Sequence, residues 1–234
     1  HKEYRRQRQM CIRDRPGRAR RRPQRHRQES AGRPEETRAR APAGAARLAL
    51  ITPANYDDHI ERLRSCDLII EAIAERMDWK TALYERIAPH VAPGAIVASN
   101  TSGLSIDALA NALPASLRER FCGIHFFNPP RYMRLVEIIA TSHTQPAVLD
   151  ELETWLTSTL GKGVIRALDT PNFVANRIGV FSILAAIHHT QRLGLGFDEV
   201  DALTGPKIGR PKSATYRTAC LLYTSDAADD TPCV

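Results

Sequence analysis

The 234-residue sequence lacks three features that would each place it in a particular class of protein. Its longest apolar runs are far too short to span a membrane, and the first residues lack the apolar core of a secretory signal. Its five cysteines do not follow the spacing of a metal site or of a disulfide framework. We therefore expect a cytoplasmic protein with reduced thiols, no membrane partner and no bound metal.

Positive charge is concentrated at one end of the chain. Residues 1–45 hold 14 Arg and 1 Lys against 5 acidic residues, a net charge of +10, whereas the remainder carries 18 basic and 21 acidic residues, a net charge of −3. A basic arm of this kind would suit nucleic acid, but Tyr4 is its one aromatic residue for base stacking. We expect no nucleic-acid partner, and a nucleic-acid-binding arm stays as an alternative.

Both ends of the chain differ in composition from the rest. Residues 1–45 show no apolar periodicity and cannot bury enough surface to fold. Residues 7–15 and 220–230 resemble translated sequencing adapters, and residues 16–45 resemble a GC-rich gene read in the wrong frame. We expect residues 1–45 to be disordered and non-native, and residues 220–234 to be a non-native tail. A genuine disordered basic arm is the alternative.

The region from residue 46 to residue 168 alternates between short apolar runs and amphipathic segments. The runs predict strands at 67–74, 95–100, 121–127, 135–140 and 164–168. The other segments predict helices at 78–91, 105–112 and 146–160, and a first helix that follows a short polar segment and ends near residue 64. Such alternation is typical of an α/β sheet. The pattern then changes to long helical periods, at 173–193 and 198–203, which predict the start of an all-helical second domain over 169–219.

Two of the predicted strands carry a histidine and a glutamate. Pro129 and Pro130 cannot lie inside a sheet, so the chain turns between the strands, and His125 and Glu137 are expected at the same end of the sheet. A carboxylate at one ring nitrogen fixes the histidine tautomer and stabilises the imidazolium, so the other nitrogen can act as a general base. A core histidine beside a partly exposed glutamate is the alternative.

Three segments in a fixed order resemble the 3-hydroxyacyl-CoA dehydrogenase family. They are Asn-Thr-Ser-Gly-Leu-Ser-Ile at 100–106, His-Phe-Phe-Asn-Pro at 125–129 and Asp-Thr-Pro-Asn-Phe-Val-Ala-Asn-Arg at 169–177. The resemblance runs from about residue 51 to residue 219. Residues 201–217 are more similar to the long bacterial members, in which the dehydrogenase is joined to an enoyl-CoA hydratase domain.

The resemblance implies an α/β fold with a Rossmann-like NAD-binding domain and an oxidoreductase that converts (S)-3-hydroxyacyl-CoA to 3-oxoacyl-CoA with NAD in fatty-acid β-oxidation. His125 would take the proton from the 3-hydroxyl, and Glu137 would orient and support His125. Ser102 would bond the substrate oxygen or the nicotinamide region, and Asn176 would hold the thioester-side carbonyl. The cofactor contacts that it implies are Glu75, Lys80, Asn100, Ser102 and Asn128.

Most of these residues also have an ordinary structural explanation. Ser102 is typical of a helix cap or a turn, and Asn176 could face solvent. Glu75 and Lys80 could be solvated surface charges. Asn128 precedes a proline and could simply form the turn.

The sequence departs from the family at the cofactor site. A dinucleotide site needs a glycine-rich turn after its first strand, and no Gly-x-Gly-x-x-Gly is present. Residues 1–45 occupy the place of the first βαβ unit, so residues 46–168 would form a partial NAD-binding domain that lacks this unit. We expect a fragment that binds NAD weakly and whose activity is not assured. Asn172 stands where many members have glycine, and we expect this change to be tolerated.

The resemblance also implies an acyl-CoA substrate, a homodimer formed by the helical domain of the complete protein, and a fused hydratase domain as one arrangement of the chain. Three alternatives stay open: a non-catalytic relative of the fold, a nucleic-acid-binding protein that uses the basic arm, and a dehydrogenase of another small hydroxy acid. The first of these predicts loss of the His125–Glu137 pair, yet both residues are present.

Overall fold

The structure is a computed structural model that describes residues 51–220. The chain divides after Thr170 into two compact units, and each unit is described by itself. The expectations for residues 1–45 and for the tail beyond residue 220 lie outside the described residues.

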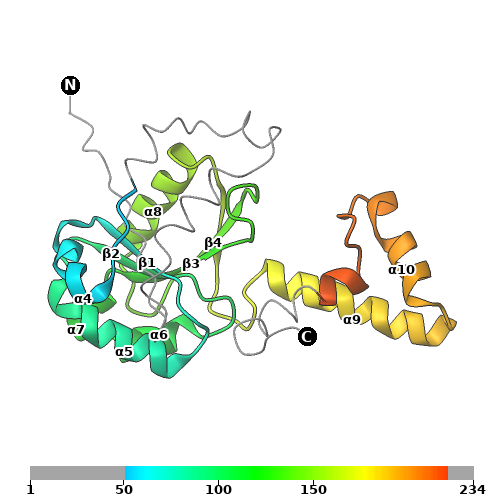
Figure 1. The fold of residues 1–234 in the computed structure, drawn as a ribbon, viewed down its shortest axis with the longest axis horizontal. Helices are drawn as coiled ribbons and strands as arrows, with labels where there is room; N and C mark the ends of the chain where they lie inside the picture. The colour runs from blue at the N-terminus through cyan, green and yellow to red at the C-terminus, as the bar shows by residue number, and fades with distance from the viewer. Residues whose placement is uncertain (1–50, 221–234) are drawn as a thin grey trace. The chain divides into compact units, whose positions relative to one another are not determined.

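The first unit is built on a five-stranded mixed sheet with the order β1-β2-β3-β4-β5 (Figure 1). Strands β1, β2 and β3 are parallel, β4 is antiparallel to β3, and β5 is parallel to β4. Their bounds are Leu68–Glu71, Ile96–Ser99, Phe121–Phe126, Leu135–Ile139 and Gly163–Ala167. The predicted α/β sheet is therefore confirmed, with β1 to β4 shorter than expected and β5 of the expected length but shifted by one residue.

Helices cover both faces of this sheet. Helix α8 lies on one side, and α5 and α6 lie on the other (Figure 1). The helical segments of the first unit are α4 (Tyr56–His59), η1 (Ile60–Ser65), α5 (Met77–Ile87), η2 (Ala88–His90), α6 (Ile106–Ala112), α7 (Ala115–Arg118) and α8 (Pro146–Ser158). The helix expected at 78–91 ends early because Pro89 has no N–H group to donate, and residues 88–90 form a 3-10 turn instead. Helix α7 was not predicted.

The two faces of the sheet differ in what they carry. Alternate strand residues pack with Val148, Leu152 and Leu156 of α8 in one apolar core; they are Ile96, Ala98, Cys122, Ile124, Val136 and Ile138. The residues between them therefore face α5 and α6, since side chains alternate along a strand. This second set includes His125 and Glu137, so the α5/α6 face carries the polar side chains of the central strands.

Strand β1 differs from the prediction. The sequence 67–74 reads as a strand buried on both faces, but Leu68, Ile69 and Ile70 are only half-buried and Glu71 alone is fully buried. The physical reason is position, because β1 is the edge strand of the sheet as described. An edge strand has a neighbour on one side only, which leaves part of its surface uncovered.

The second unit is helical. It contains α9 (Ala175–Leu193), α10 (Phe197–Thr204) and η3 (Pro206–Ile208). Asn172 precedes α9 with a φ of 64°, a left-handed conformation that asparagine adopts more readily than most other residues. This backbone conformation explains why glycine suits the position and why asparagine can replace it. Within residues 51–220, no helix is both long and apolar enough to cross a bilayer.

Gly123 lets α6 approach the sheet beside His125. A methyl group at Gly123 would lie 2.9 Å from Ile106 Cδ1, 3.0 Å from Ile106 Cγ1 and 3.1 Å from Ile139 Cβ. These distances are shorter than ordinary carbon contacts, so α6 and β4 would have to move. A glycine is therefore required here by space and not by backbone conformation.

We expect Gly123→Ala to lower the free energy of unfolding by about 1–3 kcal/mol, because the added methyl group overpacks the interface between β3 and α6. The matched control is Gly94→Ala, since a methyl group at Gly94 would meet no atom within 4 Å. Urea denaturation of both variants checks the difference. Equal midpoints would contradict the close packing at Gly123.

Candidate active site

His125 and Glu137 form a buried polar contact between two neighbouring strands. They lie directly opposite one another in the antiparallel ladder of β3 and β4. His125 Nδ1 is 2.7 Å from Glu137 Oε2, and the exposed fractions of the two residues are 3% and 0%. The prediction that the two strands bring these residues together is confirmed. Glu137 is fully buried, so the alternative of a partly exposed glutamate is wrong.

This contact has a defined chemical consequence. A buried carboxylate at Nδ1 holds the proton on that nitrogen and stabilises the imidazolium, so Nε2 is the ring nitrogen suited to proton exchange. The ring of Phe127 packs against the imidazole at a centroid distance of 4.5 Å, which helps to fix the ring plane. The catalytic roles of His125 and Glu137 stay predictions.

Asn100 joins the ends of three strands. Its backbone N–H donates to the carbonyl of Glu71 in β1 over 2.7 Å, and its side-chain oxygen accepts from the N–H of Phe126 in β3 over 3.0 Å. Asn100 therefore fixes the carboxyl edge of the parallel strands, which is where open α/β sheets bind ligands. Its predicted contact with a cofactor is not tested by this geometry.

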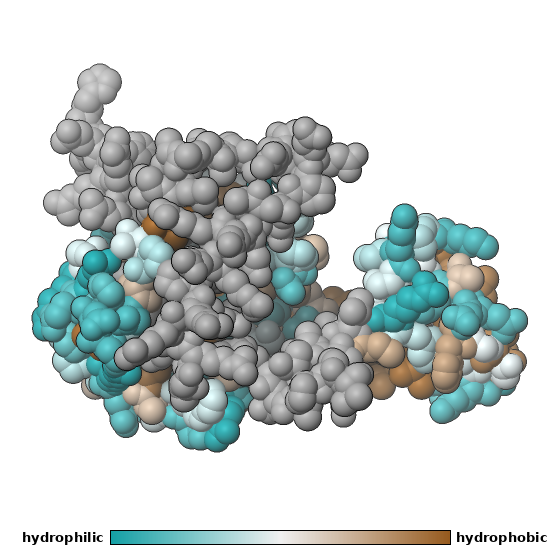
Figure 2. Space-filling model, viewed as in Figure 1, coloured by the Kyte–Doolittle hydropathy of each residue, from teal (hydrophilic) through white to brown (hydrophobic). Residues whose placement is uncertain are grey.

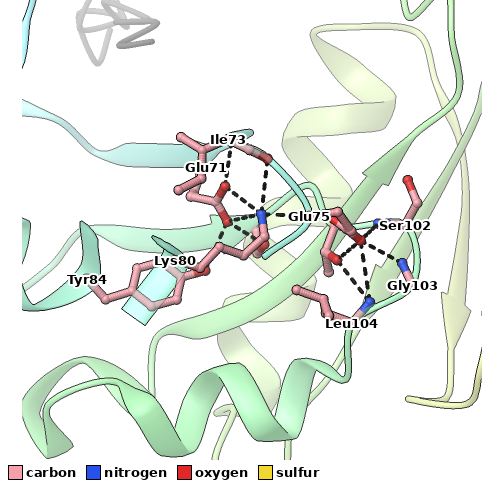
Figure 3. Close-up of polar contacts among 10 residues, drawn as sticks. Glu71, Ile73, Glu75, Lys80, Tyr84, Ser102, Gly103 and Leu104 are labelled. Carbon is pink, nitrogen blue, oxygen red and sulfur yellow. Dashed lines mark hydrogen bonds and ion pairs between the residues drawn. The ribbon is translucent and has the colours of Figure 1, made fainter. Parts of the chain in front are cut away.

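Glu75 organises the loop that follows β2, as Figure 3 shows. Its Oε1 atom accepts a hydrogen bond from the Thr101 hydroxyl and from the backbone N–H groups of Ser102 at 2.8 Å, Gly103 at 2.8 Å and Leu104 at 3.4 Å. Burial acts to raise the pKa of Glu75, but these hydrogen bonds and the charge of Lys80 outweigh it and lower the pKa overall. Glu75 is thus ionised and fixed in place.

Lys80 is not the solvated surface charge that the alternative suggests. Its side chain is fully buried, and Nζ lies 2.7 Å from Oε1 and 2.9 Å from Oε2 of Glu71. Glu71 also accepts from the hydroxyls of Tyr84 and Ser99, at 3.0 Å and 2.7 Å. We expected Lys80 at the cofactor, and that contact remains a prediction.

Tyr84 and Ser99 were not singled out from the sequence. One signal was available, because Lys80 and Tyr84 are four residues apart and therefore share one face of α5. Glu71 and Ser99 lie opposite one another in the ladder of β1 and β2, but that pairing cannot be deduced from sequence spacing. The buried cluster is therefore a feature that only the folded chain reveals.

The remaining predicted site residues lie in different parts of the structure. Ser102 is exposed in the loop held by Glu75, and Asn128 is exposed at the cis peptide bond that precedes Pro129. Asn176 lies in the first turn of α9, in the second unit, and is half-buried. The roles of all three residues stay predictions.

Asp169 fixes the start of α6 from the far end of the first unit. Its carboxylate accepts from the Ser105 hydroxyl at 2.7 Å and from the N–H groups of Ile106 at 3.0 Å and Asp107 at 2.9 Å. The Ser105 hydroxyl in turn accepts from the N–H of Ala108, so Ser105 is the N-cap of α6. Asp169 therefore ties the end of the first unit to the helix that follows the Ser102 loop.

Two of the described cysteines, Cys66 and Cys122, are buried, whereas Cys220 is exposed. Cys66 and Cys122 are free thiols, and burial raises the pKa of each, that of Cys122 to about 12. Neither thiol is therefore a ready nucleophile at neutral pH. Among the residues that the structure describes, no cluster of three His, Cys, Asp or Glu side chains could hold a metal ion.

Comparison with known proteins identifies the fold. The family model for the NAD-binding domain of 3-hydroxyacyl-CoA dehydrogenase matches residues 8–170. The chain belongs to the 3-hydroxyacyl-CoA dehydrogenase family. The match includes most of the basic segment at residues 1–45, and the structure of that segment lies outside the described residues.

Relatives and solved structures agree with this family. A probable 3-hydroxyacyl-CoA dehydrogenase of Deinococcus radiodurans is 45% identical over 175 residues, which are 75% of this chain and 51% of the relative. One from Bacillus subtilis is 43% identical over 174 residues, which are 74% of this chain and 22% of the relative. FadB2 of Mycobacterium tuberculosis has a TM-score of 0.65 at 31% identity, covering 81% of this chain and 63% of that one. The chain thus spans about half or less of these curated relatives.

The 3-hydroxyacyl-CoA dehydrogenase match makes NAD the cofactor of this domain, and the described residues fit that cofactor in part. Glu75 presents a half-exposed, ionised carboxylate at the carboxyl edge of the sheet, where it can accept hydrogen bonds from hydroxyl groups. Exposed Ser102 lies directly beside it. The glycine-rich turn that would hold the pyrophosphate is absent from the sequence.

We expect the stability of the protein to fall more steeply with acid than that of the variant Glu75→Gln. The folded-state pKa of Glu75 is lower than its ordinary value of 4.5. Its contribution to stability is therefore complete above that value and is lost as the pH falls through the lower folded pKa. Urea midpoints measured from neutral pH into the acid range check this, and parallel curves for the two proteins would contradict it.

Proposed function

We propose that this chain is the dehydrogenase part of an enzyme that oxidises (S)-3-hydroxyacyl-CoA to 3-oxoacyl-CoA with NAD, in fatty-acid β-oxidation. The observation that carries the proposal is the buried contact between His125 and Glu137. It lies beside the carboxyl edge of the sheet in a domain whose family binds NAD. A base of this kind at this edge is what the oxidation of a secondary alcohol needs.

The proposed reaction removes a proton and a hydride from one carbinol. His125 Nε2 takes the proton from the 3-hydroxyl, and the imidazolium that forms is stabilised by the Glu137 carboxylate at Nδ1. When bound, NAD supplies the acceptor for the hydride that leaves C3. Because Glu137 is fully buried, its charge is poorly screened by water and acts strongly on the ring.

Two further residues have proposed roles in substrate binding. Ser102 donates a hydrogen bond to the substrate oxygen or the nicotinamide region, and its exposure on a loop that Glu75 holds supports this role. For Asn176, in the first turn of α9, the proposed role is a hydrogen bond to the thioester-side carbonyl. A base and a donor that are fixed before the substrate arrives lower the entropic cost of reaching the reactive geometry.

The proposed substrate is an acyl-CoA, and the proposed partner is a second copy of the chain. A solved relative, the (S)-3-hydroxybutyryl-CoA dehydrogenase PaaH1 of Ralstonia eutropha, supports the substrate class, with a TM-score of 0.61 at 31% identity over 77% of this chain and 60% of that one. On the second unit, Figure 2 shows apolar side chains along α9, where Ile178, Phe181 and Leu184 are exposed. An exposed apolar face of this kind supports association through the helical unit.

The proposal extends to a fused hydratase domain and a cytoplasmic location. A putative fatty acid oxidation complex trifunctional enzyme of Rickettsia prowazekii is 36% identical over 73% of this chain, which is 24% of that protein, and this relative supports a fusion. The bacterial relatives and the free thiols of Cys66 and Cys122 support a reducing cytoplasm. The presence of the buried contact between His125 and Glu137 favours an enzyme over a non-catalytic relative of the fold.

We expect His125→Ala and Glu137→Gln each to lower kcat by at least about a hundredfold, because each removes the general base or its charged support. The affinity for NAD should change little. The measurement is the formation of reduced nicotinamide with a 3-hydroxyacyl-CoA substrate, with NAD binding determined separately.

The control is Arg166→Gln, which removes exposed ion pairs with Asp150 and Glu153 and leaves the site intact. This variant should keep the parent's turnover. Turnover near that of the parent in His125→Ala or Glu137→Gln would remove the substituted residue from the mechanism. Equal activity with free hydroxy acids and with their CoA esters would favour the other class of hydroxy-acid dehydrogenase.

A further inference from the structure

We propose that Glu71 is a positioning residue, which acts through Lys80 and Glu75 to hold the loop that carries Ser102. This inference rests on the proposed function only in assigning Ser102 a role in the reaction. The contacts that link the four residues are independent of it. They form one continuous path from the end of β1 to the residues after β2 (Figure 3).

The first link is a buried carboxylate with an unusually full set of donors. Glu71 accepts from Lys80, Tyr84 and Ser99, and also from the N–H of Ile73 at 2.6 Å. Burial and the nearby Glu71 charge raise the pKa of Tyr84, so its hydroxyl stays protonated and donates. Four donors thus converge on this one carboxylate, and together they fix its orientation.

The second link is the ammonium group of Lys80. Nζ contacts Glu71, donates to the carbonyl of Ile73 at 3.4 Å and lies 3.9 Å from Oε2 of Glu75. One buried cation is thus shared by two carboxylates, of which Glu71 is buried and Glu75 has 43% of its side chain exposed. Glu71 fixes where the cation lies, and the cation fixes the orientation of Glu75.

The third link is the Glu75 carboxylate, whose two oxygens have different partners. Oε2 faces Lys80, and Oε1 accepts from Thr101 and from the N–H groups of Ser102 and Gly103. A rotation of the Glu75 carboxylate would therefore break both contacts together. The conformation of residues 102–104 consequently depends on Glu71, although Glu71 has no direct contact with these three residues among the contacts that the structure gives.

The obvious test, Glu71→Gln alone, would leave the buried Lys80 cation without the nearer of its two carboxylates and would destabilise the fold. The double variant Glu71→Gln/Lys80→Met avoids this problem, because it removes both charges and keeps similar side-chain volumes. Replacement of a buried ion pair by uncharged groups is often neutral for stability. The double variant should therefore recover most of the stability that the single variant loses.

Amide hydrogen exchange separates positioning from stability. In the double variant we expect the amides of Ser102, Gly103 and Leu104 to exchange at least about fivefold faster than in the parent, with the amides of β3 and β4 unchanged. If Glu71 and Lys80 served stability alone, the double variant would recover both its melting temperature and the protection of the amides at residues 102–104. Parent-like exchange at residues 102–104 in the folded double variant would overturn the proposal.

Two further variants calibrate the measurement. Glu75→Ala removes the acceptor itself and should give at least the same increase in exchange at residues 102–104. Arg166→Gln removes an exposed ion pair elsewhere and should leave the exchange of the loop unchanged. Hydrogen exchange is measured without substrate. If the parent protein showed no dehydrogenase activity, that result would count against the proposed function alone. The exchange rates at residues 102–104 would still decide the role of Glu71.

Discussion

The register between β3 and β4 is the constraint on which the site depends. In this register His125 and Glu137 are opposite one another and share the face that α5 and α6 cover. A shift by one residue would move either side chain to the apolar face packed by α8, because strand side chains alternate. The apolar residues on both sides of the pair thus specify the position of the polar ones, and the core supports the chemistry by fixing this register.

The same alternation concentrates buried charge at the carboxyl edge of the sheet. Glu71 and Ser99 are paired across β1 and β2 on the α5/α6 face, and α5 supplies Lys80 and Tyr84. Burying a charge is costly unless partners satisfy it, and here the partners come from two strands and a helix. Such a cluster holds its neighbours in one arrangement, which a site that must orient a base and a donor requires.

Particular residues show how far sequence reasoning reached. The contact between His125 and Glu137 was predictable because two apolar runs flank a proline turn, and strands that follow one another in sequence are usually neighbours in a sheet. The alternative that Lys80 is a solvated surface charge was wrong, because the burial of a side chain depends on which element covers it in the folded chain. The early end of α5 was readable from Pro89, whereas the uncovered face of β1 depended on its place at the edge of the described sheet.

The sequence by itself determined the succession of the five strands and of most helices, the family and the two residues of the proposed proton-transfer pair. Hydrophobic periodicity and turn residues are local properties, and a few short motifs in fixed order are enough to identify a family. Only the tertiary structure decided that Lys80 is buried against Glu71 and that Glu75 holds the Ser102 loop. These contacts join residues from separate elements, and their partners are set by packing in three dimensions and not by spacing along the chain.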